Sequence, residues 1–247
     1  MPPSLDIILP CYNPRPGWEG HVVDSLRELR SRLGNAVGSM RLYVVDDGSS
    51  RKDQIAPEHV EALRTRLDGV ELHWMAYEAN RGKGYALRTG VQEARGDLQI
   101  YTDFDFPFQV RHLAEIFREL AAGNADIVPG VRLAYRTHLD TWNRKFLSSG
   151  MRFLNRFILR LSCPDAQAGI KGFNARGRRI FLMTRIDRFL FDTEFLMLAA
   201  RGDVVVKPIE VELRPEVHFS SMGLKVMAVE AVNFLRILCR AVTTGKV

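Results

Sequence analysis

The sequence predicts an α/β protein with a mostly parallel sheet flanked by helices. Short apolar runs with strand propensity alternate with helical patterns through the first half of the chain, and this alternation favours parallel strands joined by helices. Three of the runs end in polar or turn-forming residues, which is where open α/β sheets bind ligands. The 247 residues, 46% of them hydrophobic and 26% charged, are enough to bury one large core.

The first half contains five strand candidates and four helix candidates. In the first helix candidate, Val22, Leu26 and Leu29 recur at helical spacing. The predicted strands are residues 5–9, 41–45, 70–77, 98–102 and 125–129. The predicted helices are residues 18–33, 57–67, 84–94 and 107–122. Helices between successive strands are what a parallel arrangement requires.

The second half is less regular. We expect a basic helix at residues 141–162, a loop at 163–172, a helix at 192–201, a strand at 204–213 and a C-terminal helix at 223–242. No repeat or low-complexity linker divides the chain, so residues 1–222 are expected to form one domain. Residues 223–247 are expected to be an amphipathic helix that belongs to this domain or associates with a membrane.

The charge balance points to an anionic partner. The formal net charge is +6 and the isoelectric point is near 9.4, which suits a phosphate ligand, a membrane surface or nucleic acid. We exclude nucleic acid because no basic motif interleaved with aromatic residues is present.

The cysteines and the hydropathy pattern indicate a cytoplasmic setting. Cys11, Cys163 and Cys239 are scattered and odd in number, which argues against a disulfide framework or a zinc site. No signal peptide is expected, and no apolar run reaches the roughly 18 residues of a spanning helix. The protein is therefore expected to lie on a membrane at most, without crossing it.

Two carboxylates follow the buried strand at residues 98–102. Asp103 and Asp105 lie one residue apart, and burying such a pair is costly unless a cation meets them. Oxygen ligands at a strand end suit Mg²⁺ or Mn²⁺, which also bind substrate phosphates. The alternative is an Asp-rich turn that caps the next helix.

Polar or basic residues also follow two other strands and open one helix. The strand at 41–45 runs into Asp46 and Asp47, and the strand at 5–9 runs into residues 10–14. Residues 80–84, which include Lys83, open a helix whose free N–H groups can bind phosphate. The alternative for this last segment is a tight turn with solvated bases. Together the strand ends predict a site for a nucleoside diphosphate.

These segments, taken in order, resemble the inverting family 2 glycosyltransferases of GT-A fold. The resemblance covers about residues 5–222, and its last two segments are similar to the branch of dolichyl- and polyprenyl-phosphate mannose and glucose synthases. The matching segments are Pro10-Cys11-Tyr12-Asn13, Val45-Asp46-Asp47-Gly48-Ser49, Asn80-Arg81-Gly82-Lys83-Gly84, Asp103-Phe104-Asp105, residues 165–173 and residues 191–196.

The resemblance implies a role for individual residues. It implies that Asp103 and Asp105 hold the metal and that residues 1–222 are the catalytic domain. The implied nucleotide-sugar residues are Pro10, Tyr12, Asn13, Asp46, Asp47, Lys83, Asp103 and Phe104. The implied residues for an acceptor phosphate are Arg132, Arg144, Ser148, Gln167 and Lys171.

Three positions depart from the family pattern. Pro107 stands where the branch often has a glutamine that contacts the metal, and Gln109 lies two residues later. Phe104 replaces a small residue near the ribose, and Val131 replaces the serine of a Gly-Ser-Arg segment.

The implied chemistry depends on the acceptor. Asp105 with its metal and Arg132 would stabilise the departing diphosphate while the acceptor attacks from the opposite face. A phosphate acceptor is already ionised and needs no base, whereas a hydroxyl needs a carboxylate to take its proton. Asp192 and Glu194 are the candidates for that base. The alternative for both is the acidic first turn of a helix.

Basic and amphipathic segments favour a lipid acceptor. Arg152, Arg156 and Arg160 recur every fourth residue and form one face of a helix. Such a face suits anionic lipid, although a solvated face on a core helix gives the same pattern. We therefore expect sugar transfer from a UDP- or GDP-sugar to a polyprenyl phosphate at the cytoplasmic membrane face. The alternatives are a family 2 enzyme acting on a saccharide or lipid hydroxyl, and an inactive membrane-binding module.

Overall fold

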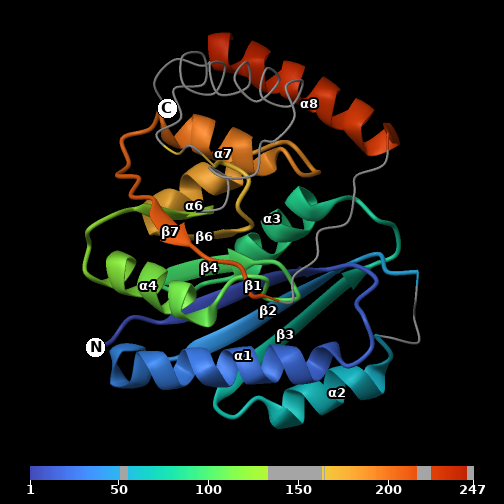
Figure 1. The fold of residues 1–247 in the computed structure, drawn as a ribbon, viewed down its shortest axis with the longest axis vertical. Helices are drawn as coiled ribbons and strands as arrows, with labels where there is room; N and C mark the ends of the chain where they lie inside the picture. Colours follow the sequence, from blue (N-terminus) through green and yellow to red (C-terminus); the bar gives the residue numbers. More distant parts are fainter. Residues whose placement is uncertain (51–54, 133–162, 164, 216–223, 244–247) are drawn as a thin grey trace.

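The computed structural model describes residues 1–50, 55–132, 163, 165–215 and 224–243 (Figure 1). Their strands form one seven-stranded sheet in the order β3-β2-β1-β4-β6-β5-β7. The strands are β1 (Leu5–Cys11), β2 (Met40–Asp47), β3 (Val70–Tyr77), β4 (Leu98–Thr102), β5 (Ile127–Arg132), β6 (Ile170–Asn174) and β7 (Ile209–Val211). β6 runs antiparallel to β4 and β5, and the other pairings are parallel. The predicted mostly parallel α/β fold is confirmed.

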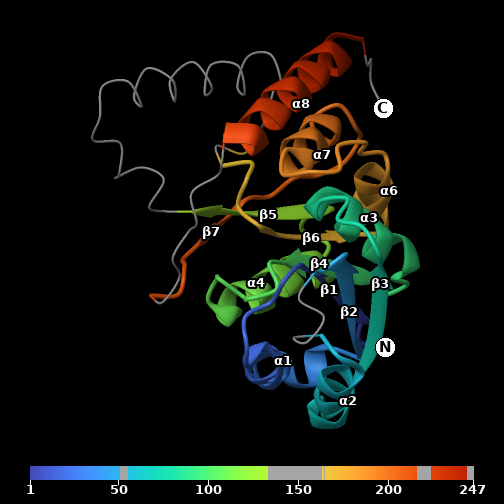
Figure 2. The same ribbon diagram turned by 90° about the vertical axis from the view of Figure 1, so that its right-hand side faces the viewer.

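Helices cover both faces of the sheet (Figure 2). Along β1, Ile7 and Leu9 pack among residues of α1, α2 and α4, whereas Ile8 packs on the opposite side with residues of α3, α6, α7 and α8. This alternation follows from the two-residue period of a strand. The helices are α1 (Trp18–Leu33), η1 (Gly34–Ala36), α2 (Pro57–Arg66), α3 (Lys83–Glu93), α4 (Val110–Ala121), α6 (Ala175–Leu182), α7 (Phe191–Ala199) and α8 (Leu224–Thr243).

The main departure from the predicted elements is β6 with α6. The expected loop at residues 163–172 runs into a central strand, and a helix follows it directly. The sequence does not predict β6 because this strand carries Lys171 and Gly172 in place of an apolar run. Gly172 is needed there because a Cβ atom would lie 2.3 Å from Cγ2 of Ile116.

Two smaller departures concern residues 107–122 and 204–213. The helix expected from residue 107 begins at Val110. It starts late because Phe108 forms a β-bridge with Leu213, two residues after β7. The strand expected at 204–213 is reduced to β7, with a separate bridge between Val206 and Ile127.

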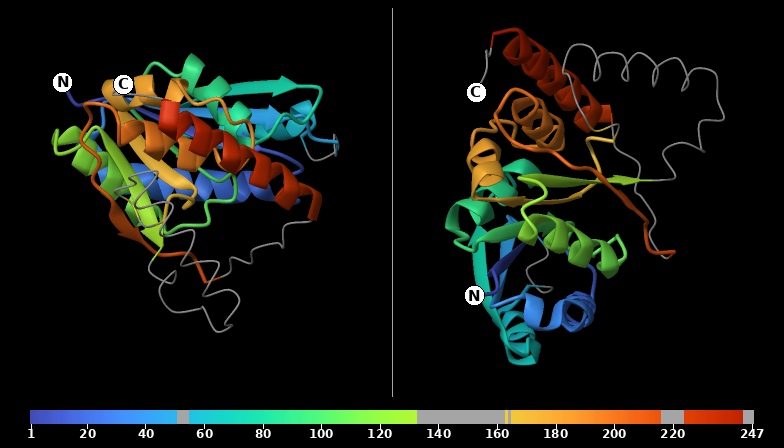
Figure 3. Two further views of the ribbon diagram at one scale, coloured as in Figure 1. Left: turned by 90° about the horizontal axis from the view of Figure 1, so that it is seen from above. Right: turned by 90° about the vertical axis from the view of Figure 1, so that its left-hand side faces the viewer.

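The right panel of Figure 3 shows α8 beyond α7 at one end of the molecule. Ile237 and Ala241 are buried with α6 and α7 residues, so one side of α8 belongs to the core. Within the described residues, no helix has both the length and the apolarity needed to cross a bilayer. The basic stretch expected at residues 141–162 lies outside the described residues.

Candidate active site

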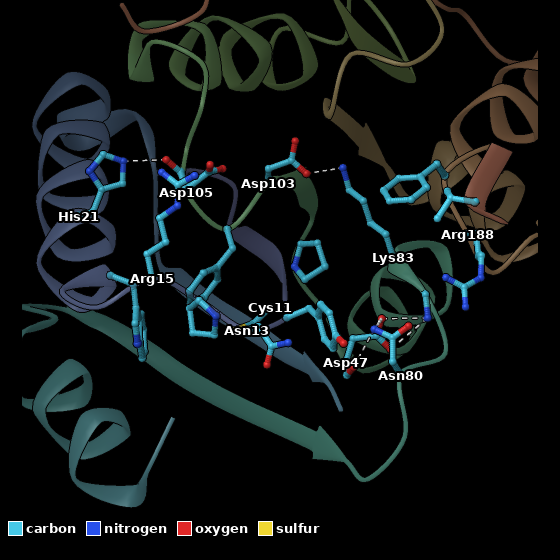
Figure 4. A pocket seen from close by; sticks show the side chains of 18 of the residues that line it. Cys11, Asn13, Arg15, His21, Asp47, Asn80, Lys83, Asp103, Asp105 and Arg188 are labelled. Atoms are coloured by element: carbon cyan, nitrogen blue, oxygen red, sulfur yellow. Dashed lines mark hydrogen bonds and ion pairs between the residues drawn. The ribbon is translucent and has the colours of Figure 1, made fainter. Parts of the chain in front are cut away.

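A pocket of about 600 Å³ opens at the carboxyl ends of β1, β2 and β4 (Figure 4). Parallel pairing places these ends together, since Cys11 of β1 lies opposite Asp46 of β2. The lining also includes the start of α3, the loop between α6 and α7, and Val226 of α8. The structure thus joins the strand ends that the sequence predicted with elements from the second half of the chain.

Asp103 lines the pocket and forms an ion pair with Lys83, the first residue of α3 (Figure 4). Burial by itself lowers the pKa of Lys83, but the charges of Asp103 and Asp192 outweigh it, so the pKa lies above its usual range. Lys83 is therefore a fixed cation beside a carboxylate. Gly169 packs against this pair, because a Cβ atom there would lie 2.4 Å from Oδ2 of Asp103 and 3.1 Å from Nζ of Lys83.

Asp105 lies in a tight turn that α1 holds in place. The Phe106 N–H donates to the Asp103 carbonyl over 3.0 Å, and Phe106 is buried with a left-handed φ of 45°. His21 of α1 bonds through Nε2 to the Asp105 carbonyl at 2.7 Å, which makes Nε2 the donor. Arg214, three residues after β7, donates to the Phe108 carbonyl at 3.3 Å and so ties the residues after the turn to the end of β7. The turn is fixed from both sides.

The carboxylates of Asp103 and Asp105 fit a hard divalent cation. Burial raises the pKa of Asp105, and the negative charge of Asp103 raises it further, so a cation placed here would relieve an electrostatic cost. Carboxylate oxygens are suitable ligands for Mg²⁺ or Mn²⁺. No group of three or more His, Cys, Asp or Glu side chains with metal-binding geometry occurs among the described residues.

Asp47 organises the loop that leads into α3. Its carboxylate accepts hydrogen bonds from the Tyr77 hydroxyl at 2.6 Å, from the Asn80 amide at 2.9 Å and from the backbone N–H groups of Arg81 at 2.8 Å and Gly82 at 2.9 Å. Burial and this hydrogen bond raise the pKa of Tyr77. Asp47 therefore shapes one wall of the pocket while its own oxygens are engaged by the protein.

The loop after β1 is fixed against the loop after β2. Asn13 adopts a left-handed φ of 46°, and its side-chain oxygen accepts from the Ser50 N–H at 2.9 Å. Its own N–H donates to the Ser49 hydroxyl at 2.8 Å, and the Asp46 carboxylate accepts from the Ser49 N–H at 2.9 Å. Asp46 is fully buried beneath this contact, whereas Tyr12 is 52% exposed at the pocket edge.

Asp192 lies behind the pocket in a buried network with Lys171. Its Oδ1 atom accepts from Lys171 Nζ at 2.6 Å and from the Tyr101 hydroxyl, while Lys171 also donates to the Ala168 carbonyl at 2.7 Å. Burial raises the pKa of Tyr101 well above its usual range, and the charge of Asp192 adds to this. Asp192 and Lys171 are almost completely buried, and neither contributes to the pocket lining.

Glu194 of α7 holds together three segments: α7 itself, the loop after α6, and α8. Its Oε2 atom accepts from the backbone N–H groups of Arg185 at 2.7 Å and Ile186 at 2.9 Å, and its Oε1 atom pairs with Arg240 of α8. Glu194 is buried and does not line the pocket. The structure therefore does not bring this predicted base to the site.

Only some of the residues predicted to bind an acceptor phosphate lie in the described part of the chain. Arg132 ends β5 and forms a two-pronged ion pair with Asp165, with contacts of 2.7 Å from Nε and 2.9 Å from Nη2. Gln167 is exposed. Arg144 and Ser148 lie outside the described residues. Lys171 is buried on Asp192 and does not line the pocket. The assignment of these five residues to an acceptor phosphate stays a prediction.

Sequence reasoning missed several side chains that line the pocket. Trp18 and His21 come from the first turns of α1, and Trp18 packs against Phe104 with ring centroids 5.0 Å apart. Arg188 and Phe189 come from the loop between α6 and α7. For Trp18 and His21, the only signal in the sequence is that α1 follows soon after the turn-forming residues at the end of β1. The second pair depends on tertiary packing.

The chain matches one protein family and several curated relatives. The family description "Glycosyl transferase family 2" matches residues 6–179. Dolichyl-phosphate beta-glucosyltransferase from Saccharomyces cerevisiae is 26% identical over 257 residues, which is 98% of this chain and 75% of that protein. The Drosophila melanogaster enzyme of the same name is 30% identical, with 85% of this chain and 68% of that protein covered. Glycosyltransferase AglD from Haloferax volcanii is 28% identical over 86% of this chain, which spans 33% of that protein.

Solved structures share the fold at low sequence identity. Mannosyl-3-phosphoglycerate synthase from Rubrobacter xylanophilus aligns with a TM-score of 0.68 at 16% identity, covering 98% of this chain and 74% of that one. The mannosyltransferase PcManGT from Pyrobaculum calidifontis, solved with GDP-Man and Mn²⁺, aligns with a TM-score of 0.64 at 18% identity, covering 100% and 66%. These neighbours confirm the GT-A fold. With its strand-end pocket and the family match over most of its length, the chain belongs to glycosyl transferase family 2 and is a glycosyltransferase similar to the dolichyl-phosphate glucosyltransferases.

Proposed function

We propose that this glycosyltransferase moves a sugar, with inversion, from a UDP- or GDP-sugar to a polyprenyl phosphate at the inner face of the membrane, using Mg²⁺ or Mn²⁺. The observation that carries the proposal is that Asp103, Lys83 and Asp105 together line a pocket large enough for a nucleotide sugar. The relatives named for dolichyl phosphate support the acceptor, and the neighbour solved with GDP-Man and Mn²⁺ supports the donor and the metal.

The nucleotide is expected to lie along the ends of β1 and β2. Pro10, Tyr12 and Asn13 would line the base and ribose, and Tyr12 is exposed enough to stack on a base. Asp46 would act through the loop after β2, whose Ser49 N–H it binds. Asp47 lines the pocket and would bind the base side of the donor while it holds the loop before α3 through Tyr77, Asn80 and backbone N–H groups. Loss of either carboxylate would therefore weaken donor binding.

The diphosphate is expected to face Lys83 and the two carboxylates of the tight turn. Lys83 begins α3, so its ammonium group and the N-terminal end of that helix both favour negative charge. A divalent cation held by Asp103 and Asp105 would supply further positive charge to the leaving diphosphate. Phe104, between the two carboxylates, packs on Trp18, and the two rings give that side of the pocket an apolar lining.

An acceptor that is already ionised agrees best with the carboxylates in this site. Among the described residues that line the pocket, the carboxylates are Asp47, Asp103 and Asp105. Asp47 is engaged by the protein, and the other two are the metal candidates. Asp192 and Glu194 are buried behind the pocket on protein donors. A phosphate oxygen needs no base to attack, and we propose that Arg132, Arg144, Ser148 and Gln167 help to hold that phosphate.

The test is sugar transfer by the purified protein with and without the two carboxylates. We expect label from a UDP- or GDP-sugar to enter a lipid-extractable, mild-acid-labile product only when Mg²⁺ or Mn²⁺ is present. Asp103→Ala and Asp105→Ala should each lower the rate by at least about 100-fold, because both act on the developing charge. Asp24→Ala, at a carboxylate that is 73% exposed, is the matched control and should leave the rate unchanged.

Two outcomes would contradict the proposal. Full transfer by both carboxylate variants would remove the catalytic role of the strand end. Label found only in a product stable to mild acid and to alkali would show that the acceptor is a hydroxyl.

A further inference from the structure

The helix α8 turns three of its polar side chains, Glu230, Asn233 and Arg240, toward the protein. Glu230 is buried and accepts from the backbone N–H groups of Phe189 at 3.3 Å and Leu190 at 3.1 Å. Asn233 is buried as well, and Arg240 pairs with Glu194 and donates to the Met183 carbonyl at 3.0 Å. These polar contacts fix how α8 sits on the protein and leave its other side facing outward.

The outward side of α8 is apolar. Val229 is 44% exposed, Val232 49%, Leu235 61% and Val242 82%. Four of the nine large apolar side chains that are exposed in the described part of the chain therefore lie on this one helix. If this side of α8 met only water, polar side chains would be expected where Val229, Val232, Leu235 and Val242 stand. The exposed face needs a partner to cover it.

This apolar face continues into the mouth of the pocket. Val226, in the first turn of α8, lines the pocket, and so does Phe189, which is 43% exposed and is bonded through its N–H to Glu230. The face also has a charge preference. Glu230 is the only acid in the sequence of α8 and is buried, whereas Arg236 is exposed. The exposed charge on the helix is thus cationic.

We propose that the outward face of α8, defined by Val229, Val232, Leu235 and Val242, docks on the surface of an anionic lipid bilayer and holds the pocket mouth against it. This inference rests on the proposed function, because a polyprenyl-phosphate acceptor presents its phosphate at such a surface. A second copy of the chain fits less well. It would cover Phe189 and Val226 at the pocket mouth, and a two-fold contact would bring Arg236 near its own copy, whereas anionic headgroups attract that arginine.

The first experiment measures cosedimentation with vesicles of phosphatidylcholine, with and without phosphatidylglycerol. We expect the wild-type protein to bind the mixed vesicles and to bind pure phosphatidylcholine more weakly. Leu235→Glu should lower the partition coefficient by roughly tenfold, because it removes an apolar anchor and adds a charge that anionic lipid repels. Val205→Glu is the matched control, since Val205 is 56% exposed and lies outside α8, and it should bind as the wild type does. Thermal melting checks that both variants fold.

Binding by Leu235→Glu equal to that of the wild type would overturn the inference. So would light scattering that finds a wild-type dimer which Leu235→Glu dissociates, because a second copy would then be the partner of this face.

A second measurement separates this inference from the proposed function. Transfer to a polyprenyl phosphate dispersed in detergent micelles should proceed equally in the wild type and in Leu235→Glu, whereas transfer to the same acceptor embedded in vesicles should fall severalfold in the variant. Absence of transfer by the wild type in micelles would count against the proposed function alone. Equal rates of the two proteins on vesicles would count against the role of α8 alone.

Discussion

Gly169 shows how much of this site depends on the absence of a single methyl group. The residue lies beside the Asp103 and Lys83 pair, between the buried Ala168 and the first residue of β6. A side chain here would have to displace the carboxylate that is proposed to meet the metal. The position of Asp103 is therefore set from behind by β6 as well as from below by β4.

We predict that Gly169→Ala lowers sugar transfer and the affinity for Mn²⁺ with nucleotide by at least about tenfold, since an ångström-scale misplacement of a catalytic group has effects of this size or larger. Titration calorimetry with Mn²⁺ and the nucleotide would measure the affinity. Gly20→Ala is the control, because a Cβ atom there has its nearest neighbour at 3.7 Å, and it should leave both quantities unchanged. Wild-type Mn²⁺ affinity in Gly169→Ala would show that Asp103 has room to move.

Among the secondary-structure elements, α7 connects the loop that lines the pocket to α8. Glu194 in its first turn binds two backbone N–H groups of the loop after α6 and the guanidinium of Arg240. That loop continues into Arg188 and Phe189, which reach the pocket. One buried carboxylate thus ties the loop that leads to the pocket wall to α8.

We predict that Glu194→Gln lowers the free energy of unfolding by about 2 kcal/mol, because a glutamine satisfies only part of the donors that the buried carboxylate accepts. Urea unfolding followed by circular dichroism would measure this loss. Glu28→Gln serves as the comparison, since Glu28 pairs with Arg32 at an exposed position on α1 and should change the midpoint too little to resolve. Equal midpoints for the two variants would show that Glu194 contributes no more than a surface pair.

For the whole molecule, several buried groups keep their protons at high pH. Burial raises the pKa of Cys163 to about 11 from 9.0, and burial also raises the pKa values of Cys11 and Tyr101. The pKa of Lys83 is raised by its acidic neighbours. In each case the folded state binds its proton more tightly than the unfolded state does.

We predict that the free energy of unfolding falls steadily as the pH rises from about 9 toward 11. The sign follows from linkage, because over this range the unfolded chain releases protons that the folded chain retains. Urea unfolding at constant ionic strength, at pH values on both sides of about 9, would measure the decline. A free energy of unfolding that stayed constant or rose over this range would show that these groups titrate normally in the folded protein.

The sequence was most informative where local patterns decide the structure. The strand ends at Asp47 and Asp103 could be located because each follows an apolar run, and the parallel fold followed from the alternation of strands and helices. β6 was missed because Lys171 looks like a surface residue until Asp192, 21 positions later, is packed against it. Arg188 and Val226 could not be assigned to the pocket for the same reason, because contacts distant in sequence bring them there.

The antiparallel strand β6 makes the order of synthesis matter for this protein. It lies between β4 and β5, although both of those strands precede it in the chain. Until residues 170–174 have left the ribosome, β4 has an open edge, β5 has no neighbouring strand, and the proposed catalytic turn has no backing from Gly169. A product truncated before this point would expose the edges of β4 and β5 to intermolecular pairing, so it is expected to aggregate instead of surviving as a weakly active enzyme.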